Sequence, residues 1–174
     1  MFVSTLASFL TFVGINCSAE PLTQGASLPK LQVVNQDGQS INLADFASQP
    51  YVLVYFYPKA DTPGCTAQSC SLRDAYAELT DSGVTVIGVS GDSPASQKAF
   101  KNKYQLPFVL IADENSSVAD AFGVPVRAGR FPSRQAFLFK DNKLVWHDAS
   151  ASTKTQADDV KSILAKQAQA STDS

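Results

Sequence analysis

Runs of β-branched and aromatic residues recur along the chain, and most are separated by segments with helical periodicity. Residues 51–57 read Tyr-Val-Leu-Val-Tyr-Phe-Tyr and stop at Pro58, which is the composition of a strand buried on both faces. Further strands of this kind are expected at residues 84–90 and 108–111. The pattern therefore predicts a sheet with residues 51–57 at its centre.

Helices are expected between and after these strands. Apolar residues recur at helical spacing in residues 65–79, which end near a serine-glycine pair. Residues 92–94 read Asp-Ser-Pro, a capping residue ahead of an early proline, as at the start of a helix. Residues 116–122 and 155–169 have the pattern of a short helix and of a closing helix. Strands joined through helices form right-handed crossovers, so these strands should pair in parallel.

Two hairpins complete the prediction. Residues 31–35 and 40–43 are short strands around an Asp-Gly turn, and residues 135–139 and 143–146 flank an Asp-Asn pair. The second hairpin should add antiparallel strands to the sheet. The sequence thus predicts an α/β protein with a thioredoxin-like fold, in which helices flank a central mixed β-sheet and a β-hairpin lies near the amino terminus.

Length and composition indicate one globular domain. The chain has 174 residues, 44% of them hydrophobic and 17% charged, and a domain of about 150 residues buries enough surface to fold without disulfides or metals. We place this domain at residues 25–167 and expect a polar tail at 168–174. The net charge of −2 is too balanced to favour nucleic acid or an anionic membrane as a partner.

Residues 1–19 have a different character. Residues 1–15 are apolar and uncharged, too few for the roughly 20 residues of a membrane-spanning helix, and small residues precede Glu20 as at a signal-peptidase site. We expect a cleaved signal peptide and export to a periplasmic or lumenal space, although the first basic residue is only Lys30. The alternatives are a lipid anchor at Cys17, or a retained amino-terminal helix on a cytoplasmic protein.

Cys65 follows a strand and a loop and is expected to open a helix. Unpaired backbone N–H groups and the positive end of the helix dipole favour negative charge at that position. Because the thiolate is the nucleophilic form of cysteine, Cys65 is a candidate for reaction. Taken alone, it could equally be a cysteine that only packs in the core.

Cys70 lies five positions further along the same predicted helix. An i, i+5 pair on a helix has Cα atoms about 8.6 Å apart, whereas a disulfide needs less than about 7 Å. A bond between Cys65 and Cys70 therefore requires the first turns of the helix to unwind.

The residues before Cys65 carry a resemblance. Pro58, Thr62 and Cys65 have the spacing P-x-x-x-T-x-x-C, and the stretch Tyr-Pro-Lys-Ala-Asp-Thr-Pro-Gly-Cys at 57–65 resembles the active-site segment of peroxiredoxins. With Cys70 beyond it, the segment is similar to that of the peroxiredoxin Q, or bacterioferritin-comigratory, subfamily. The resemblance covers residues from about 25 to 166.

The resemblance implies roles for the residues around the cysteine. Thr62 would offer its hydroxyl to the thiolate or the peroxide, and Pro58 would shield the sulfur. Arg134, directly before a predicted strand, would stabilise the thiolate and polarise the peroxide O–O bond. Arg127 and Arg130 are competing sources of positive charge, and without the resemblance Arg134 would pass for a surface residue.

One position departs from the subfamily. Peroxiredoxins commonly carry glutamate three residues after the reactive cysteine, where this chain has Gln68. An amide keeps the hydrogen bonds but lacks the charge that could orient an arginine. We expect altered reactivity rather than none.

The function implied by the resemblance is that of a thioredoxin-dependent thiol peroxidase. Cys65 would reduce hydrogen peroxide or an organic hydroperoxide, Cys70 would close an intramolecular disulfide, and a thioredoxin-like dithiol would restore both thiols. No cofactor is needed, and the subfamily implies a monomer.

Other chemistries fit less well. Cys65, Cys70 and His147, which we expect at the surface, do not make a four-ligand zinc set, so no metal is predicted. The main alternative is a thioredoxin-like thiol-disulfide oxidoreductase acting on proteins, although such enzymes normally use C-x-x-C. A third reading is a redox-inert binding module on the same fold.

Overall fold

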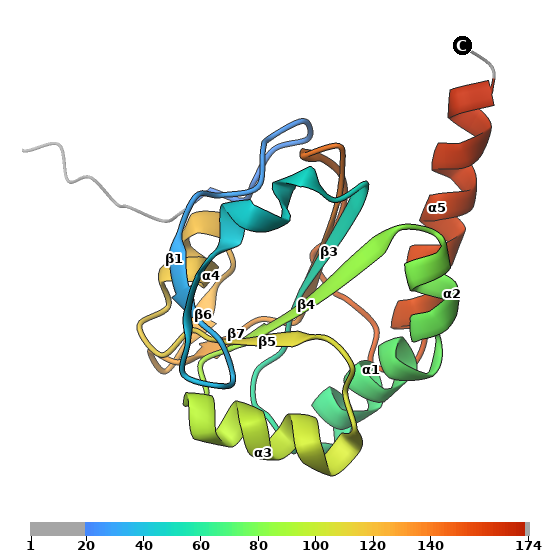
Figure 1. Cartoon of the computed structure of the whole chain (residues 1–174). Coiled ribbons are helices and arrows are strands. Elements are labelled where there is room, and N and C mark those ends of the chain that lie inside the picture. Colours follow the sequence, from blue (N-terminus) through green and yellow to red (C-terminus); the bar gives the residue numbers. More distant parts are fainter. Residues whose placement is uncertain (1–19, 173–174) are drawn as a thin grey trace, which may run out of the picture.

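The computed structural model describes residues 20–172 and has a five-stranded sheet at its centre, in the order β5-β4-β3-β8-β9 (Figure 1). Its strands are β3 (Tyr51–Phe56), β4 (Val84–Ser90), β5 (Val109–Ala112), β8 (Gln135–Lys140) and β9 (Lys143–Asp148). Strand β3 pairs in parallel with β4 and antiparallel with β8, so the sheet is mixed. The predicted fold class and the central position of β3 are confirmed.

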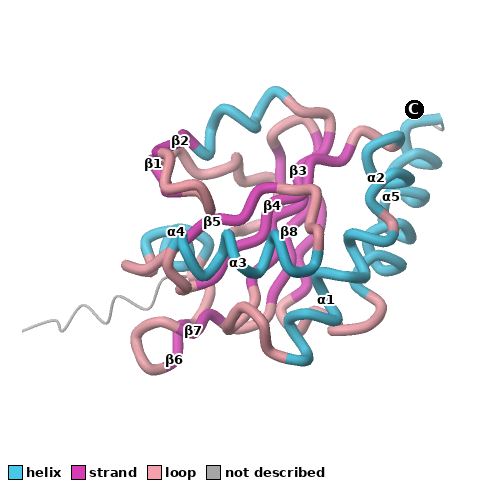
Figure 2. Tube along the Cα trace, turned by 60° about the horizontal axis from the view of Figure 1, so that its bottom comes forward, coloured by secondary structure: helices cyan, strands magenta, loops and turns pink. Residues whose placement is uncertain are grey.

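Helices cover both faces of this sheet (Figures 1 and 2). They are α1 (Pro63–Asp74), α2 (Tyr76–Asp81), α3 (Pro94–Tyr104), α4 (Ser117–Phe122) and α5 (Gln156–Thr172), with a 3-10 helix at Leu43–Ser48. In both views α1, α2 and α5 gather on one side of the sheet, and α4 lies on the other. The closing helix α5 therefore packs beside α1.

Two hydrophobic clusters lie on the two faces of β3. Leu53, Tyr55 and Tyr57 belong to the cluster beneath α1, α2 and α5, and Val54 and Phe56 belong to the cluster on the α4 side. All five side chains are 0% exposed. The alternation of side chains along a strand thus explains why β3 has almost no polar residues.

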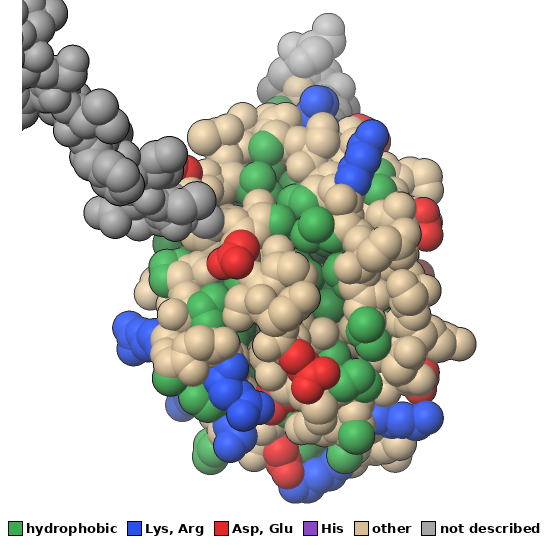
Figure 3. Space-filling view, turned by 90° about the vertical axis from the view of Figure 1, so that its left-hand side faces the viewer, with side chains coloured by type: hydrophobic (Ala, Val, Ile, Leu, Met, Phe, Trp, Pro, Cys, Tyr) green, Lys and Arg blue, Asp and Glu red, His purple; other side chains and the backbone are tan. Residues whose placement is uncertain are grey.

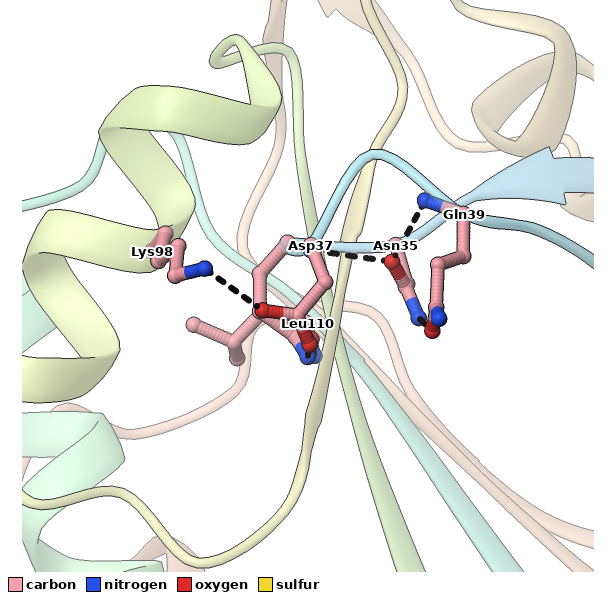
Figure 4. Close-up of polar contacts among 6 residues, drawn as sticks. Asn35, Asp37, Gln39, Lys98 and Leu110 are labelled. Carbon is pink, nitrogen blue, oxygen red and sulfur yellow. Dashed lines mark hydrogen bonds and ion pairs between the residues drawn. The ribbon is translucent and has the colours of Figure 1, made fainter.

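The early hairpin forms as predicted, but as a separate two-stranded sheet of β1 (Gln32–Val34) and β2 (Ser40–Asn42). Its turn contacts the edge of the central sheet: Gln36 N donates to Leu110 O, and Leu110 N donates to Gln36 Oε1, both at 2.9 Å. Figure 4 shows this turn, in which Asn35 Oδ1 accepts from two backbone N–H groups. The turn thereby occupies backbone groups of β5 that would otherwise lie open at the edge.

A third hairpin, with very short strands, was not predicted from the sequence. Strands β6 (Val126–Arg127) and β7 (Phe131–Pro132) pair with each other, and Arg130 lies between them. Its strands have two residues each, which is too short for a period-two pattern to be recognised in the sequence. This hairpin leads directly into β8.

The helix predicted at residues 65–79 is in fact two helices. The first begins at Pro63, because Thr62 is extended and Pro63 suits the first helical position. The helix stops at Ala75, whose φ of −94° and ψ of 6° interrupt the helical geometry before α2 begins. At the other end of the chain, α5 continues past the predicted end at Gln169 to Thr172.

The face that carries β1 and α4 shows hydrophobic side chains between polar ones, and side chains of both charges (Figure 3). This mixture agrees with the small net charge of −2. Within residues 20–172, none of the helices has both the length and the apolar character needed to cross a bilayer.

His147 lies inside β9, which extends beyond the predicted strand end at Trp146, and is partly exposed. Its ring stacks on Phe137 with centroids 4.2 Å apart, and its Nε2 is 2.8 Å from Gln135 Oε1. Burial lowers the pKa of His147, and the nearby Asp148 offsets part of this effect. Partial burial therefore favours the neutral form of the imidazole.

This burial predicts a loss of stability at acidic pH. Below its unfolded-state pKa of about 6.5, His147 binds a proton more readily in the unfolded chain than in the folded one. The free energy of unfolding should therefore decrease as the pH falls below about 6.5. In His147→Phe, which keeps the stacked ring, this part of the decrease should disappear. Urea unfolding at several pH values measures it, and identical pH profiles for the two proteins would contradict the prediction.

Candidate active site

Cys65 is the third residue of α1, after Pro63 and Gly64, and is 2% exposed. The prediction that it opens the helix was wrong by two residues, but it still lies in the first turn. The first bond of this turn is Thr66 N to Thr62 O, at 2.8 Å. The N–H groups ahead of that bond have no acceptor within the helix, so they contribute positive potential beside the sulfur.

Arg134 comes to this cysteine from the residue before β8. Its Nη2 donates to Cys65 Sγ at 3.3 Å, and its Nη1 donates to Gln68 Oε1. A Cβ atom on Gly64 would lie 3.4 Å from Arg134 Nη2, so the helix backbone passes close to the guanidinium. Among the described residues Arg134 makes no ion pair. Its positive charge is therefore available to the sulfur.

The competing arginines do not contact the sulfur, although Arg127 lines the same cleft as Arg134. Arg127 and Arg130 belong to the β6–β7 hairpin and are exposed. The guanidinium of Arg130 lies 5.5 Å from the ring centre of Phe131. Of the three candidate arginines, only Arg134 contacts the sulfur.

Gln68 is fully buried and lies three positions after Cys65, one turn along the same face of α1. A guanidinium can only donate hydrogen bonds, so the Gln68 side chain presents its oxygen to Arg134. The Gln68 Nε2 then donates to Gln156 Oε1 of α5 at 2.9 Å. Sequence reasoning missed Gln156, because a glutamine at the start of a helix carries no signal of contact with a site 88 residues away.

Thr62 and Pro58 belong to the loop that leads into α1. The Thr62 hydroxyl donates to Lys59 O at 2.9 Å, so it would have to rotate to donate to a ligand. Pro58 and Arg134 line a cleft of about 450 Å³. The remaining lining residues come from the β6–β7 hairpin and the segment after β9: Arg127, Phe131, Pro132, Ser133, Ala149, Ser150 and Ala151. The cleft gives Arg134 an opening toward solvent.

The loop itself is held by polar contacts on both sides. Ala60 N donates to the buried Asp92 Oδ2 at 2.7 Å. Asp61, with a φ of 57°, accepts from Lys103 Nζ at 2.8 Å and from Tyr104 Oη at 2.5 Å. These two hydrogen bonds lower the pKa of Asp61. The carboxylate therefore stays charged and ties the loop to α3.

Cys70 lies in the same unbroken helix α1 as Cys65, and both are free thiols. Cys65 is buried and Cys70 is partly exposed. Because the helix is intact from Pro63 to Asp74, the spacing of about 8.6 Å between their Cα atoms applies. The described conformation is thus a reduced one in which the two sulfurs cannot bond.

Two further contacts fix the middle of α1. The Tyr55 hydroxyl on β3 is 2.9 Å from Ser69 Oγ, and Ala157 N of α5 donates to Ser71 Oγ at 3.3 Å. Burial raises the pKa of Tyr55 well above its usual value, so the phenol stays protonated. The helix is therefore held from the sheet between the two cysteines, at Ser69, and from α5 just after Cys70, at Ser71.

Within residues 20–172 there is no group of three or more histidine, cysteine, aspartate or glutamate side chains arranged to hold an ion. Cys17 and the rest of the predicted signal peptide, residues 1–19, lie outside the described residues.

Comparison with known proteins adds three informative matches. Peroxiredoxin Q of Oryza sativa subsp. japonica, named as chloroplastic, is 43% identical over 125 residues, which are 71% of this chain and 57% of that protein. Peroxiredoxin Bcp of Escherichia coli is 50% identical over 104 residues, 60% of this chain and 66% of that one. A solved structure of the bacterioferritin comigratory protein of Xanthomonas campestris, described for its alkyl peroxide reduction, matches with a TM-score of 0.75 and 25% identity over 84% of this chain and 99% of that one. This chain thus spans about 57% of the length of the rice relative.

The mixed sheet and its flanking helices define the class of thioredoxin-fold peroxiredoxins. The chain belongs to the AhpC/TSA family, whose model matches residues 24–147. The resemblance to peroxiredoxin Q and bacterioferritin-comigratory proteins is confirmed by these relatives.

Proposed function

We propose that the chain is a thiol peroxidase in which Cys65 attacks a hydroperoxide. The contact of 3.3 Å between Arg134 Nη2 and Cys65 Sγ, in the first turn of α1, carries this proposal. A positive charge and free backbone N–H groups beside one sulfur favour the thiolate and also attract the oxygens of a peroxide. A cysteine that served only to pack the core would need neither.

The first step transfers one oxygen atom. The Cys65 thiolate attacks the terminal oxygen of the hydroperoxide, a sulfur–oxygen bond forms, and the O–O bond breaks. The alkoxide or hydroxide that leaves takes up a proton and departs as an alcohol or water. The cysteine is oxidised by two electrons to sulfenic acid, and the guanidinium of Arg134 stabilises the charge that develops on the oxygens.

Cys70 is proposed as the resolving residue. Its thiolate attacks the sulfenic sulfur of Cys65, a disulfide forms, and the sulfenic oxygen leaves as water after protonation. Because the two cysteines lie too far apart on the intact helix, α1 must unwind before this step. A thioredoxin-like dithiol then returns two electrons by thiol-disulfide exchange.

Thr62 and Pro58 are proposed to shape the peroxide site. The Thr62 hydroxyl, once rotated from Lys59 O, can donate to the bound peroxide. Pro58 forms one wall of the cleft beside Arg134. The cleft of about 450 Å³ is large enough for organic hydroperoxides as well as hydrogen peroxide. The Xanthomonas relative is described for alkyl peroxide reduction, which supports the same substrate class here.

The two cysteines predict separable defects. Wild-type protein mixed with hydrogen peroxide in a stopped-flow instrument should form sulfenate orders of magnitude faster than a free thiol. Cys65→Ser should abolish that reaction, because it removes the nucleophile. Cys70→Ser should keep the first turnover but lose recycling by thioredoxin, and it should be overoxidised more easily, because nothing captures the sulfenic acid.

Two outcomes would reject this scheme. A Cys65→Ser protein that still consumes peroxide at the wild-type rate would place the reaction elsewhere. Slow peroxide reaction together with rapid reduction of insulin disulfides would favour the alternative, a thiol-disulfide oxidoreductase acting on proteins.

Residues 1–19 are proposed to be a cleaved targeting segment. The support is their apolar, uncharged composition and the small residues before Glu20. The rice relative is named as chloroplastic, which supports a targeting role for this segment. The proposed destination is a periplasmic or lumenal space. Mass spectrometry of the native protein should find an amino terminus near Glu20. An intact Met1, or a lipid on Cys17, would contradict cleavage at this site.

We also propose that the enzyme acts as a monomer, as its subfamily resemblance implies. Sedimentation of the reduced protein at micromolar concentration should give the mass of one chain. A stable dimer would contradict this proposal.

A further inference from the structure

A line of three side chains connects the reactive sulfur to α5. Arg134 contacts Cys65 with Nη2 and Gln68 with Nη1, and Gln68 donates a hydrogen bond to Gln156. Gln68 and Gln156 are both 0% exposed. The buried Gln68 side chain therefore links the peroxide site to Gln156, the first residue of α5. Helix α5 itself contributes no residue to the lining of the cleft.

The direction of every hydrogen bond in this line follows from its first member. Arg134 can only donate, so Gln68 must turn its oxygen toward the guanidinium and its nitrogen toward α5. Gln156 must then accept with Oε1, which leaves its own Nε2 at the end of the line. Turning the Gln156 amide over would set two N–H₂ groups against each other.

The Gln156 Nε2 finds no acceptor among the described residues, although it is buried. Only one other buried side-chain polar atom among them, Thr66 Oγ1, lacks a partner. A buried donor without an acceptor destabilises the folded protein. A methionine or leucine could fill the same space without that cost, so a glutamine at this position is better explained by what its oxygen does for Gln68 than by packing.

Gln156 is itself held firmly in place. The next residue, Ala157, donates its backbone N–H to Ser71 Oγ of α1 at 3.3 Å, and Val160, one turn further along α5, is 0% exposed. The start of α5 is thus attached to α1 on the same side as Gln68. A fixed oxygen at Gln156 restricts the Gln68 amide to one position, and Gln68 in turn restricts the guanidinium.

We propose that Gln156 is a positioning residue for the peroxidase reaction, acting on Cys65 through Gln68 and Arg134. The effect of Gln156 on peroxide reduction rests on the proposed function. The effect of its contact with Gln68 on Cys65 can be tested without peroxide. Because no carboxylate pairs with Arg134 among the described residues, two neutral amides orient the arginine without cancelling its charge.

The same bond should also oppose disulfide formation. Gln68 lies between Cys65 and Cys70 on α1, so unwinding that brings the two sulfurs together must move Gln68 and break its bond to Gln156. Gln156 therefore has opposite effects on two successive steps. It favours attack by Cys65 in the folded helix, and it delays resolution by Cys70.

Gln156→Met tests both effects, because methionine has nearly the same shape and cannot accept the hydrogen bond strongly. We expect sulfenate formation by hydrogen peroxide to slow about tenfold. This is the effect on the rate of losing one hydrogen bond that helps to position the charged guanidinium of Arg134. Disulfide formation from the sulfenate should become faster. Gln156→Glu, whose carboxyl group is kept neutral by burial and can still accept from Gln68 Nε2, should restore the first rate.

Gln36→Met is the matched control. Gln36 is also buried, at 6% exposure, and its side chain accepts from Leu110 N at 2.9 Å and donates to Asp37 Oδ2, but it lies in the β1–β2 turn and does not contact the line of residues described here. Its loss should lower the melting temperature and leave both cysteine rates unchanged. Opposite changes in the two rates in Gln156→Met, absent in Gln36→Met, would separate positioning from general destabilisation.

Alkylation by iodoacetamide, followed at Cys65 by peptide mass mapping, keeps this test independent of the peroxidase assignment. If the wild-type protein reacts with peroxide no faster than a free thiol, the proposed function fails, and slower alkylation in Gln156→Met still supports the positioning role. If Gln156→Met alkylates and oxidises as fast as the wild type, the positioning role is wrong. Should Gln156→Met not fold, Gln156→Asn, one methylene too short to reach Gln68, should show the same slowing.

Discussion

The guanidinium of Arg134 is the group on which the site depends, because it is shared between Cys65 Sγ and Gln68 Oε1. Cys65 and Gln68 present their side chains to one arginine only while the first turn of α1 is helical. Arg134 is placed by β8, which pairs with β3 at the centre of the sheet. The site thus draws on two buried parts of the fold, the central strands and the inner side of α1.

The same helix turn imposes a constraint on the second cysteine. An intact α1 presents Cys65 to Arg134 and keeps Cys70 out of bonding distance. The proposed mechanism therefore needs two conformations in one cycle: a helical one for attack on the peroxide and an unwound one for the disulfide. Contacts such as the one between Tyr55 and Ser69 hold the first conformation. Their strength sets how readily the second is reached.

Much of the fold and of the segment around Cys65 could be predicted from the sequence, because strong local patterns indicate them. These patterns depend on residues that are close together in the sequence: the apolar run of β3, the two predicted hairpins, and the spacing of Pro58, Thr62 and Cys65. The fold and the family followed from them. The positions of Pro63 as the helix start and Ala75 as the break were missed, because boundaries depend on a few residues with weak preferences.

The long-range part of the site could not be predicted in the same way. Arg134 was singled out by resemblance, since nothing local separates it from Arg127 or Arg130. Gln156 could not be found at all, because its partner is 88 residues away and a buried glutamine looks like any other polar residue in a sequence. Tertiary packing alone brings these side chains together.

Hydrogen exchange of the reduced and oxidised proteins tests the central claim most directly. With the Cys65–Cys70 disulfide verified by mass spectrometry, amides from Thr66 to Cys70 should lose protection on oxidation, whereas those of β3 and β4 should keep it. Equal protection of this segment in both forms, with the disulfide present, would contradict the account, because the bond would then have formed across an intact helix.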